Sequence, residues 1–156
     1  MKFRGFTPTN FHGDREKTLT WVKNTGYALY YAEQFQDDNE IVLTAIQRVG
    51  SFLKYASERL RNTRSVVLAA VQNGGIALEF ASEQLKNTPE IVLSAVKNCG
   101  WALKHASERL KDDPEIVATA VRTNPGAIKY ASERLQQGGG KTTLKKSRYR
   151  RIIDDK

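Results

Sequence analysis

Apolar and polar positions along the chain follow a pattern that repeats every 25 residues. KYASERL at residues 54–60 recurs, with small changes, at 79–85, 104–110 and 129–135, and a shorter version, YYAEQF, stands at 30–35. A second shared segment lies upstream of each of these, and its five versions read EKTLTWVKN, EIVLTAIQR, SVVLAAVQN, EIVLSAVKN and EIVATAVRT. Self-similarity at a fixed period of this size is typical of proteins built from stacked repeats.

The upstream segment predicts a short helix in each copy, because its apolar residues follow helical spacing. Asp38, Thr88 and Asp113 stand where a helix N-cap is expected. Pro89 and Pro114 follow at the first helical position, where a missing N–H is tolerated. A second short helix is then expected to cover the KYASERL segment.

Between the two predicted helices lies a column of glycines, namely Gly26, Gly50, Gly75 and Gly100. Glycine directly after a helix commonly adopts a left-handed backbone conformation, which we expect at these positions. Pro125 takes this place in the last copy and prevents the helix from continuing.

The second predicted helix carries one column of large aliphatic residues and one of alanines. They are Leu29, Leu53, Leu78, Leu103 and Ile128, and Ala32, Ala56, Ala81, Ala106 and Ala131. The alanines indicate close approach between helices. Since helices of about 9 or 10 residues are too short to be stable alone in water, each copy must bury its apolar face against its neighbours.

The chain is therefore predicted to be all-α, an α-solenoid of five short two-helix repeats with a flexible basic C-terminal tail. The expected parts are an N-terminal extension (1–13), the five-repeat solenoid (14–137) and a Gly-rich hinge with the basic tail (138–156). The repeats themselves are expected at 14–37, 38–62, 63–87, 88–112 and 113–137.

The columns resemble the tandem repeats of the domain-of-unknown-function family four-one-one-six. The resemblance is most complete from Glu90 to Leu110, EIVLSAVKNCGWALKHASERL. It implies repeat arrays of bacteria, protists and large DNA viruses, with no agreed activity and no catalytic residue to carry over. The first copy departs most, because Trp21 stands in the column of Ala45, Ala70, Ala95 and Ala120. That copy is a candidate N-terminal cap.

Composition narrows the class of protein further. The chain has 156 residues, of which 40% are hydrophobic, and this suits one folded domain. No apolar run approaches the ~18 residues of a membrane-spanning helix, and the N-terminus has no signal-peptide pattern. Cys99 is the only cysteine, which excludes an internal disulfide and fits a reducing compartment. We expect a soluble intracellular protein, cytoplasmic or nuclear, with a virion as the alternative location.

The segment GGGKTT at residues 138–143 raises the alternative of a nucleotide-binding loop. The phosphate-loop pattern needs a glycine five residues before Gly140, where this chain has Leu135. It also needs a preceding strand, whereas a repeat helix is expected here. The glycines are therefore interpreted as a helix stop and hinge.

Residues for catalysis or metal binding are scarce. His105 stands in the column of Tyr31, Tyr55, Phe80 and Tyr130, and is interpreted as a packing residue. The recurring glutamates, accompanied by Arg59, Arg109 and Arg134, fit a solvated or inter-repeat ladder of ion pairs. No Cys/His cluster has metal-ligand spacing. We expect no cofactor, no metal, no small-molecule substrate and no enzymatic activity.

Partner binding is expected on columns that vary between copies. The position after the glycine reads Tyr27, Ser51, Ile76, Trp101 and Gly126. Of these, Tyr27 and Trp101 are the candidates, and Trp101 is either an exposed anchor or the filler of a gap between repeats. A second variable column reads Tyr30, Lys54, Glu79, Lys104 and Lys129. A basic stripe is the second candidate, interrupted by Glu79, with a merely solvated face as its alternative. Its residues are Lys54, Lys97, Lys104, Arg122 and Lys129.

The tail holds most of the net charge of +8. Residues 138–156 contain 7 Lys/Arg and 2 Asp, a balance of +5, which leaves +3 for residues 1–137. Six cations and one aromatic residue are the candidates for binding nucleic acid: Lys141, Lys145, Lys146, Arg148, Tyr149, Arg150 and Arg151. A nuclear-targeting signal and a solubilising end are the alternatives.

The sequence therefore favours a non-enzymatic protein-interaction module or scaffold, in a larger assembly or a host–pathogen setting. The alternative is a nucleic-acid-associated protein, such as a virion component, that binds RNA or DNA through its tail.

Overall fold

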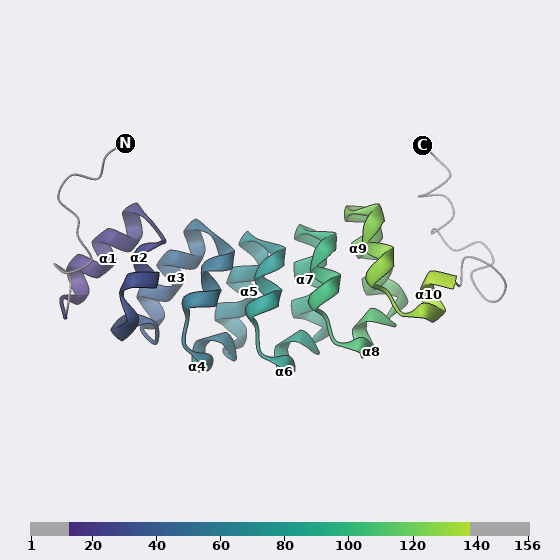
Figure 1. Ribbon diagram of the computed structural model, residues 1–156, viewed down its shortest axis with the longest axis horizontal. Helices are drawn as coiled ribbons and strands as arrows, with labels where there is room; N and C mark the ends of the chain where they lie inside the picture. The colour runs from purple at the N-terminus through teal and green to yellow at the C-terminus, as the bar shows by residue number, and fades with distance from the viewer. Residues whose placement is uncertain (1–12, 138–156) are drawn as a thin grey trace.

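The computed structural model describes residues 13–137, and every regular element in that range is a helix (Figure 1). Five α-helices of 10 residues recur along it: α1 (Arg15–Asn24), α3 (Asn39–Arg48), α5 (Arg64–Asn73), α7 (Pro89–Asn98) and α9 (Pro114–Thr123). The all-α expectation is confirmed for these residues.

The segment after each long helix is not one helix. After α3, α5, α7 and α9 it divides into a six-residue 3₁₀ helix and a short α-helix. The 3₁₀ helices are η3 (Gly50–Tyr55), η4 (Gly75–Phe80), η5 (Gly100–His105) and η6 (Pro125–Tyr130). The short helices are α4 (Glu58–Arg61), α6 (Glu83–Lys86), α8 (Glu108–Lys111) and α10 (Glu133–Gln137). After α1 the equivalent elements are α2 (Ala28–Tyr31) and η2 (Glu33–Phe35).

The expectation of a single second helix is therefore wrong, and in the four later copies the serine of the ASE motif gives the reason. Ala56 is extended, with φ −74° and ψ 153°, and Ser57 then accepts a hydrogen bond from the Leu60 N–H as the N-cap of α4. Serine favours this cap geometry over a helix interior because its hydroxyl competes for backbone groups. Ser82 and Ser107 repeat the same cap, so the break recurs with the motif.

The predicted N-caps of the long helices lie where expected, although one caps differently. Asp38 and Asp113 each accept two backbone N–H groups from the first turn of α3 and α9. Thr88 is the N-cap residue of α7, but its hydroxyl donates to the Gln84 carbonyl oxygen at 3.0 Å instead. Pro89 occupies the first turn of α7, as predicted.

The left-handed conformation expected at the glycine column is wrong. Among the glycines of residues 13–137 only Gly13 has a positive φ, while Gly50, Gly75 and Gly100 begin 3₁₀ helices and Gly26 lies just before α2. We call one long helix and the two short elements after it a unit. Because these glycines have no side chain, their backbone can lie directly against the next unit. A Cβ on Gly50 would lie 2.2 Å from the Ala70 carbonyl oxygen of α5, and one on Gly100 would lie 2.2 Å from that of Ala120.

The units pack in a row, each against the next. α1, α3, α5, α7 and α9 lie side by side in chain order and form one layer, while η3, η4, η5 and η6 form a second layer against it. Figure 1 shows the elongated shape that results, with the short helices α4, α6 and α8 along one edge. The core lies between the layers, where Leu53, Leu78 and Leu103 are fully buried against the long helices. Each such leucine contributes roughly 1.5–3 kcal/mol by leaving water.

Candidate functional site

The 3₁₀ helices present one continuous exposed edge. A 3₁₀ helix has three residues per turn, so that residues i and i+3 lie directly above one another. After Val49, Gly74 and Cys99, the first residue is a buried glycine and the fourth a buried leucine, whereas the second and fifth residues face outward. After Asn124 the second and fifth residues are likewise exposed. We call these outward positions, with their equivalents after Thr25, the 3₁₀ edge. It consists of Tyr27, Tyr30, Ser51, Lys54, Ile76, Glu79, Trp101, Lys104, Gly126 and Lys129, all exposed except the half-buried Ser51.

The exposed large hydrophobic residues of the described chain gather at this edge. Tyr27, Tyr30, Ile76 and Trp101 belong to it, and Tyr31 and Val49 stand next to it in sequence. Tyr27 is the most exposed, at 61%. Contiguous apolar groups of this kind on a water-facing surface mark interaction sites more often than isolated ones do.

Tyrosines at the N-terminal end of the edge form a connected aromatic group. The Tyr30 ring lies 4.9 Å from that of Tyr31 and 5.2 Å from that of Tyr55, and Tyr27 meets Phe52 edge-on at 4.9 Å. The Tyr30–Tyr55 and Tyr27–Phe52 contacts cross from the first unit to the second, so they restrict the positions of the exposed rings. Trp21 stacks on Tyr31 at 5.9 Å and packs against the core from α1.

The sequence left open whether Trp101 is an exposed anchor or fills a gap between repeats, and in the structure it does part of each. Its ring reaches the next unit, where a Cβ on Gly126 would lie 2.5 Å from it, and it meets Tyr130 edge-on at 6.1 Å. It nevertheless remains 38% exposed. Trp101 thus spans the junction between two units and still presents part of its indole to solvent.

Three lysines of the edge have no carboxylate partner among the described residues. They are Lys54, Lys104 and Lys129. The Lys129 ammonium lies 5.3 Å from the centre of the Trp101 ring and 5.0 Å from that of Tyr130, and Lys54 lies 4.6 Å from that of Tyr55. A hydrogen bond with Tyr55 raises the pKa of Lys54. Lys54, Lys104 and Lys129 form a row of positive residues along the edge, and Glu79 interrupts this positive row, as the sequence indicates.

Lys97 and Arg122 lie elsewhere, in the last turns of α7 and α9. Both are exposed. Cations at this end complement the negative pole of the helix dipole, which gives these two residues a structural role independent of any partner.

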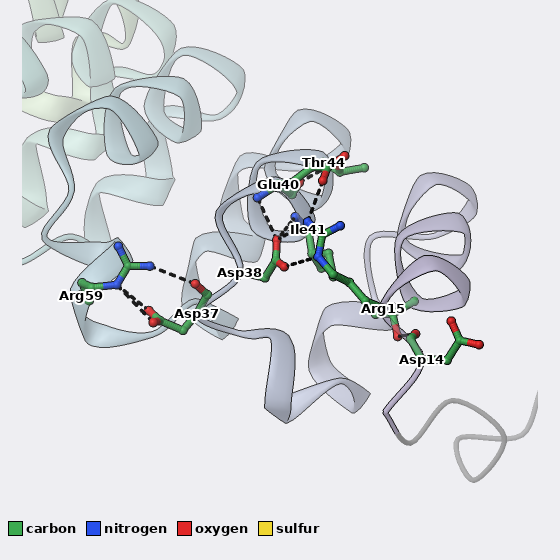
Figure 2. Close-up of polar contacts among 9 residues, drawn as sticks. Asp14, Arg15, Asp37, Asp38, Glu40, Ile41, Thr44 and Arg59 are labelled. Carbon is green, nitrogen blue, oxygen red and sulfur yellow. Dashed lines mark hydrogen bonds and ion pairs between the residues drawn. The ribbon is translucent and has the colours of Figure 1, made fainter.

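The short-helix side carries a different chemistry, in which polar groups pair with each other across units. The Ser57 hydroxyl donates to the Asp37 carboxylate. Arg59 binds the same carboxylate at 2.9 Å and the Asp37 carbonyl oxygen at 2.9 Å (Figure 2). Ser132 and Arg134 hold Asp112 in the same way. We call this arrangement the Ser–Arg clamp.

Asparagine replaces aspartate in two of these clamps. Asn87 accepts from Ser107 at 2.8 Å and from Arg109 at 2.9 Å, and Asn62 accepts from Ser82 at 2.6 Å. Gln84 stands where the others have arginine, so that clamp lacks the guanidinium bonds. Hydrogen bonds lower the pKa of Asp37, first from Ser57 and then from Arg59, and that of Asp112, first from Arg134 and then from Ser132.

Ion pairs do run between units, as one of the two expectations had it, but the arginines pair with Asp37 and Asp112 and not with the recurring glutamates. The glutamates behave differently, since Glu83 pairs with Lys86 and Glu108 with Lys111 inside their own short helices. The N-terminal junction adds another inter-unit pairing, in which Arg15 binds Asp38 at 2.6 Å and Glu40 at 2.6 Å (Figure 2). That contact holds the pKa of Asp38 below its usual value.

Asparagines at the ends of the long helices also bridge units. The Asn98 amide donates to the Gln72 carbonyl oxygen at 2.9 Å and accepts from the Gly75 N–H at 2.8 Å. Asn73 donates to the Ile46 carbonyl oxygen at 2.7 Å. These bonds satisfy backbone groups where one helix ends and the next element begins.

His105 is half-buried on η5, in line with the packing role expected from its column. Burial lowers the pKa of its imidazole, since desolvation disfavours the charged form. Nearby Glu79 acts in the opposite direction, and Lys104 adds to the lowering.

Sequence reasoning missed two parts of this surface. It did not select Tyr30, Tyr31 or Ile76 as partner-binding residues, although Ile76 stands in the column of Tyr27 and Trp101, and Tyr30 in the column of Lys54. The acceptors of the Ser–Arg clamp, 37, 62, 87 and 112, also recur every 25 residues, and this period was the signal that could have identified them.

Residues 13–137 contain no group of three or more His, Cys, Asp or Glu side chains placed to hold a metal ion. Cys99 is a half-buried free thiol. None of the helices in that range is both long enough and apolar enough to span a membrane. The candidate nucleic-acid-binding residues, from Lys141 to Arg151, lie outside the described residues.

Comparison with known proteins identifies one family. Its model is described as "Domain of unknown function (DUF4116)" and matches twice in tandem, at residues 38–86 and 88–136. The matches cover α3 to α10 and leave the first unit outside. No curated protein and no solved structure matches the chain.

Proposed function

The chain belongs to the family described as domain of unknown function DUF4116, and we propose that it is an α-solenoid of five repeats that works as a non-enzymatic protein-binding scaffold. The two tandem matches support a repeat array for residues 38–136. The first unit, α1 to η2, supports a fifth copy because it packs on the next unit through α1 and α3 as later units do.

The observation that carries the proposal is the contrast between the two sides of the row. The ion pairs of the described residues all lie at the short helices or at the starts of long helices. The 3₁₀ edge instead combines exposed aromatic rings with unpaired lysines. Aromatic residues are enriched among binding hot spots because a rigid ring buries a large area at small entropic cost. We infer that the 3₁₀ edge is the docking surface.

Site-specific photo-crosslinking tests this proposal. A photoreactive amino acid replaces Glu79 on the 3₁₀ edge or, as the matched control, Glu83 on α6, four residues away and 89% exposed at its side chain. In cells that naturally make the protein, we expect defined protein adducts from position 79 and only background from position 83. Equal adduct patterns from both positions, or none from either, would refute the scaffold.

Nucleic-acid binding by the tail is the second candidate function. The charge of +5 concentrated in residues 138–156 favours it, together with Tyr149, which can stack on a base. It is compatible with a protein-binding array, since the two functions use different parts of the chain.

A further inference from the structure

We propose that the partner segment bound by the 3₁₀ edge is acidic and carries aromatic or large aliphatic anchors, and that it crosses η3 to η6 in turn. This inference rests on the proposed function, because it states the chemistry of the partner of that same edge. It follows from the lysines of the edge, from its exposed apolar side chains, and from the interruption of the positive row by Glu79.

The first support is charge complementarity. Lys54, Lys104 and Lys129 form no ion pair with any described carboxylate, whereas Lys86 and Lys111 on the short helices are both paired. The edge therefore has three available cations against one anion, Glu79. Complementary potential across an interface raises the association rate and excludes partners of the wrong sign.

The second support is the arrangement of apolar groups between those cations. Tyr27 and Tyr30 precede Lys54, Ile76 lies between Lys54 and Lys104, and Trp101 packs under Lys129. A partner that carried only negative charge would leave these surfaces in contact with water. Anchors of aromatic or large aliphatic type would bury them, which supplies most of the affinity at such interfaces.

The same details disfavour single-stranded RNA on this edge. Binding of that kind needs a continuous positive groove along the phosphates and aromatic faces free for base stacking. Glu79 interrupts the positive row, and the Lys129 ammonium occupies one side of the Trp101 ring at 5.3 Å. A peptide has no such need for unbroken positive charge.

A random 16-residue peptide library displayed on phage, selected against the full-length chain, tests the partner chemistry. We expect enriched sequences with several Asp or Glu residues and at least one Trp, Phe, Tyr or Leu. Enrichment of basic or uncharged sequences, or no enrichment at all, would overturn the inference. Neither result would change the crosslinking from position 79, which decides the proposed function separately.

Two pairs of matched variants then locate the binding of the enriched peptide by fluorescence anisotropy. Lys104→Gln with Lys129→Gln should weaken it about tenfold, whereas Lys86→Gln with Lys111→Gln, the same charge change on the short helices, should leave it unchanged. Glu79→Lys, which completes the positive row, should strengthen binding several-fold, while Glu58→Lys on α4 should not. Equal effects within either pair would overturn the assignment to this edge.

Binding of poly(U) RNA to the full-length chain tests whether the edge binds nucleic acid instead. We expect Lys104→Gln with Lys129→Gln to leave RNA binding as it is in the parent chain. A selective loss of RNA binding in that variant would overturn the inference and assign the edge to nucleic acid.

Discussion

Gly75 of η4 lies so close to the Ala95 carbonyl oxygen of α7 that a Cβ on Gly75 would stand 2.3 Å from that oxygen. The contact joins one unit to the next through backbone atoms, which cannot rotate away as a side chain could. The same relationship links Gly50 with Ala70 and Gly100 with Ala120, both at 2.2 Å. The glycine column is therefore a property of the junctions between units.

Gly75→Ala should destabilise the protein by about 1–3 kcal/mol, because the added methyl group forces the two units apart. The measurement is urea unfolding followed by circular dichroism. Gly74→Ala is the matched control, since a Cβ there meets nothing closer than 3.8 Å and other copies have Val49 or Cys99 at this position. If both substitutions had the same effect, a general loss of glycine rather than the close contact would be responsible.

The glycine column also shows how far the sequence predicts the fold. The 25-residue period, the aspartate caps and the buried Leu53 column are visible in the sequence because they depend on local chemistry and on the chain's own repetition. The reason for Gly75 is not local, since it depends on an oxygen twenty residues further along the chain. Sequence reasoning therefore identified the right glycines but gave them the wrong conformation.

The candidate surface was predictable in part for the same reason. Trp101 and Lys129 could be selected as variable positions in a repeat, but their geometry depends on η5 and η6 being 3₁₀ helices. A 3₁₀ and an α-helix differ too little in sequence preference to be distinguished over six residues. The sequence groups Ile76 with Trp101 in one column and Tyr30 with Lys129 in another, whereas the exposure of both columns emerged only from the structure.

Gln84→Arg should stabilise the protein by about 0.5–1.5 kcal/mol by completing the one clamp that lacks a guanidinium. The expected bonds are to the side chain and carbonyl oxygen of Asn62, as Arg109 makes them to Asn87. Urea unfolding at neutral pH measures the gain. Gln84→Lys adds the same charge without the planar fork, so an equal gain from lysine would mean that charge alone is responsible.

Asp112→Asn should make the protein less sensitive to acid. In the folded chain, bonds from Arg134 and Ser132 hold the pKa of Asp112 below 3.8, so the unfolded chain binds more protons between the two pKa values. The stabilisation from Asp112 is therefore complete above about pH 4 and disappears as the pH falls through the folded-state pKa. Asparagine has no such titration, and Asn87 shows that it accepts the same bonds.

Thermal unfolding between pH 2 and 7 measures this effect. The melting temperature of Asp112→Asn should fall less steeply below pH 4 than that of the parent chain. Glu133→Gln, which removes an exposed carboxylate from α10 next to Arg134, serves as the control. Parallel curves for the parent and Asp112→Asn would show that the clamp does not govern acid stability.

His105→Phe should remove a loss of stability that occurs in mildly acidic solution. Burial holds the folded-state pKa of His105 below 6.5, so the unfolded chain binds the proton more readily. Stability from this residue is complete above the unfolded-state pKa and declines as the pH falls through and below 6.5. The melting temperature of His105→Phe should consequently change less between pH 7.5 and 5.5, as Phe80 occupies the same column. A steeper decline in the variant would contradict the assignment.

Removal of residues 138–156 should abolish salt-dependent binding of single-stranded RNA and DNA. Six cations, from Lys141 to Arg151, could release about four counterions from a single strand, which predicts a slope of up to about −4 in log affinity against log salt. Filter binding at two salt concentrations measures that slope for the full chain, the truncated chain and a full-length chain with those six cations replaced by glutamine. The glutamine variant separates loss of charge from loss of length, and both altered chains should behave alike. Unchanged affinity after truncation would exclude the tail as the source of binding.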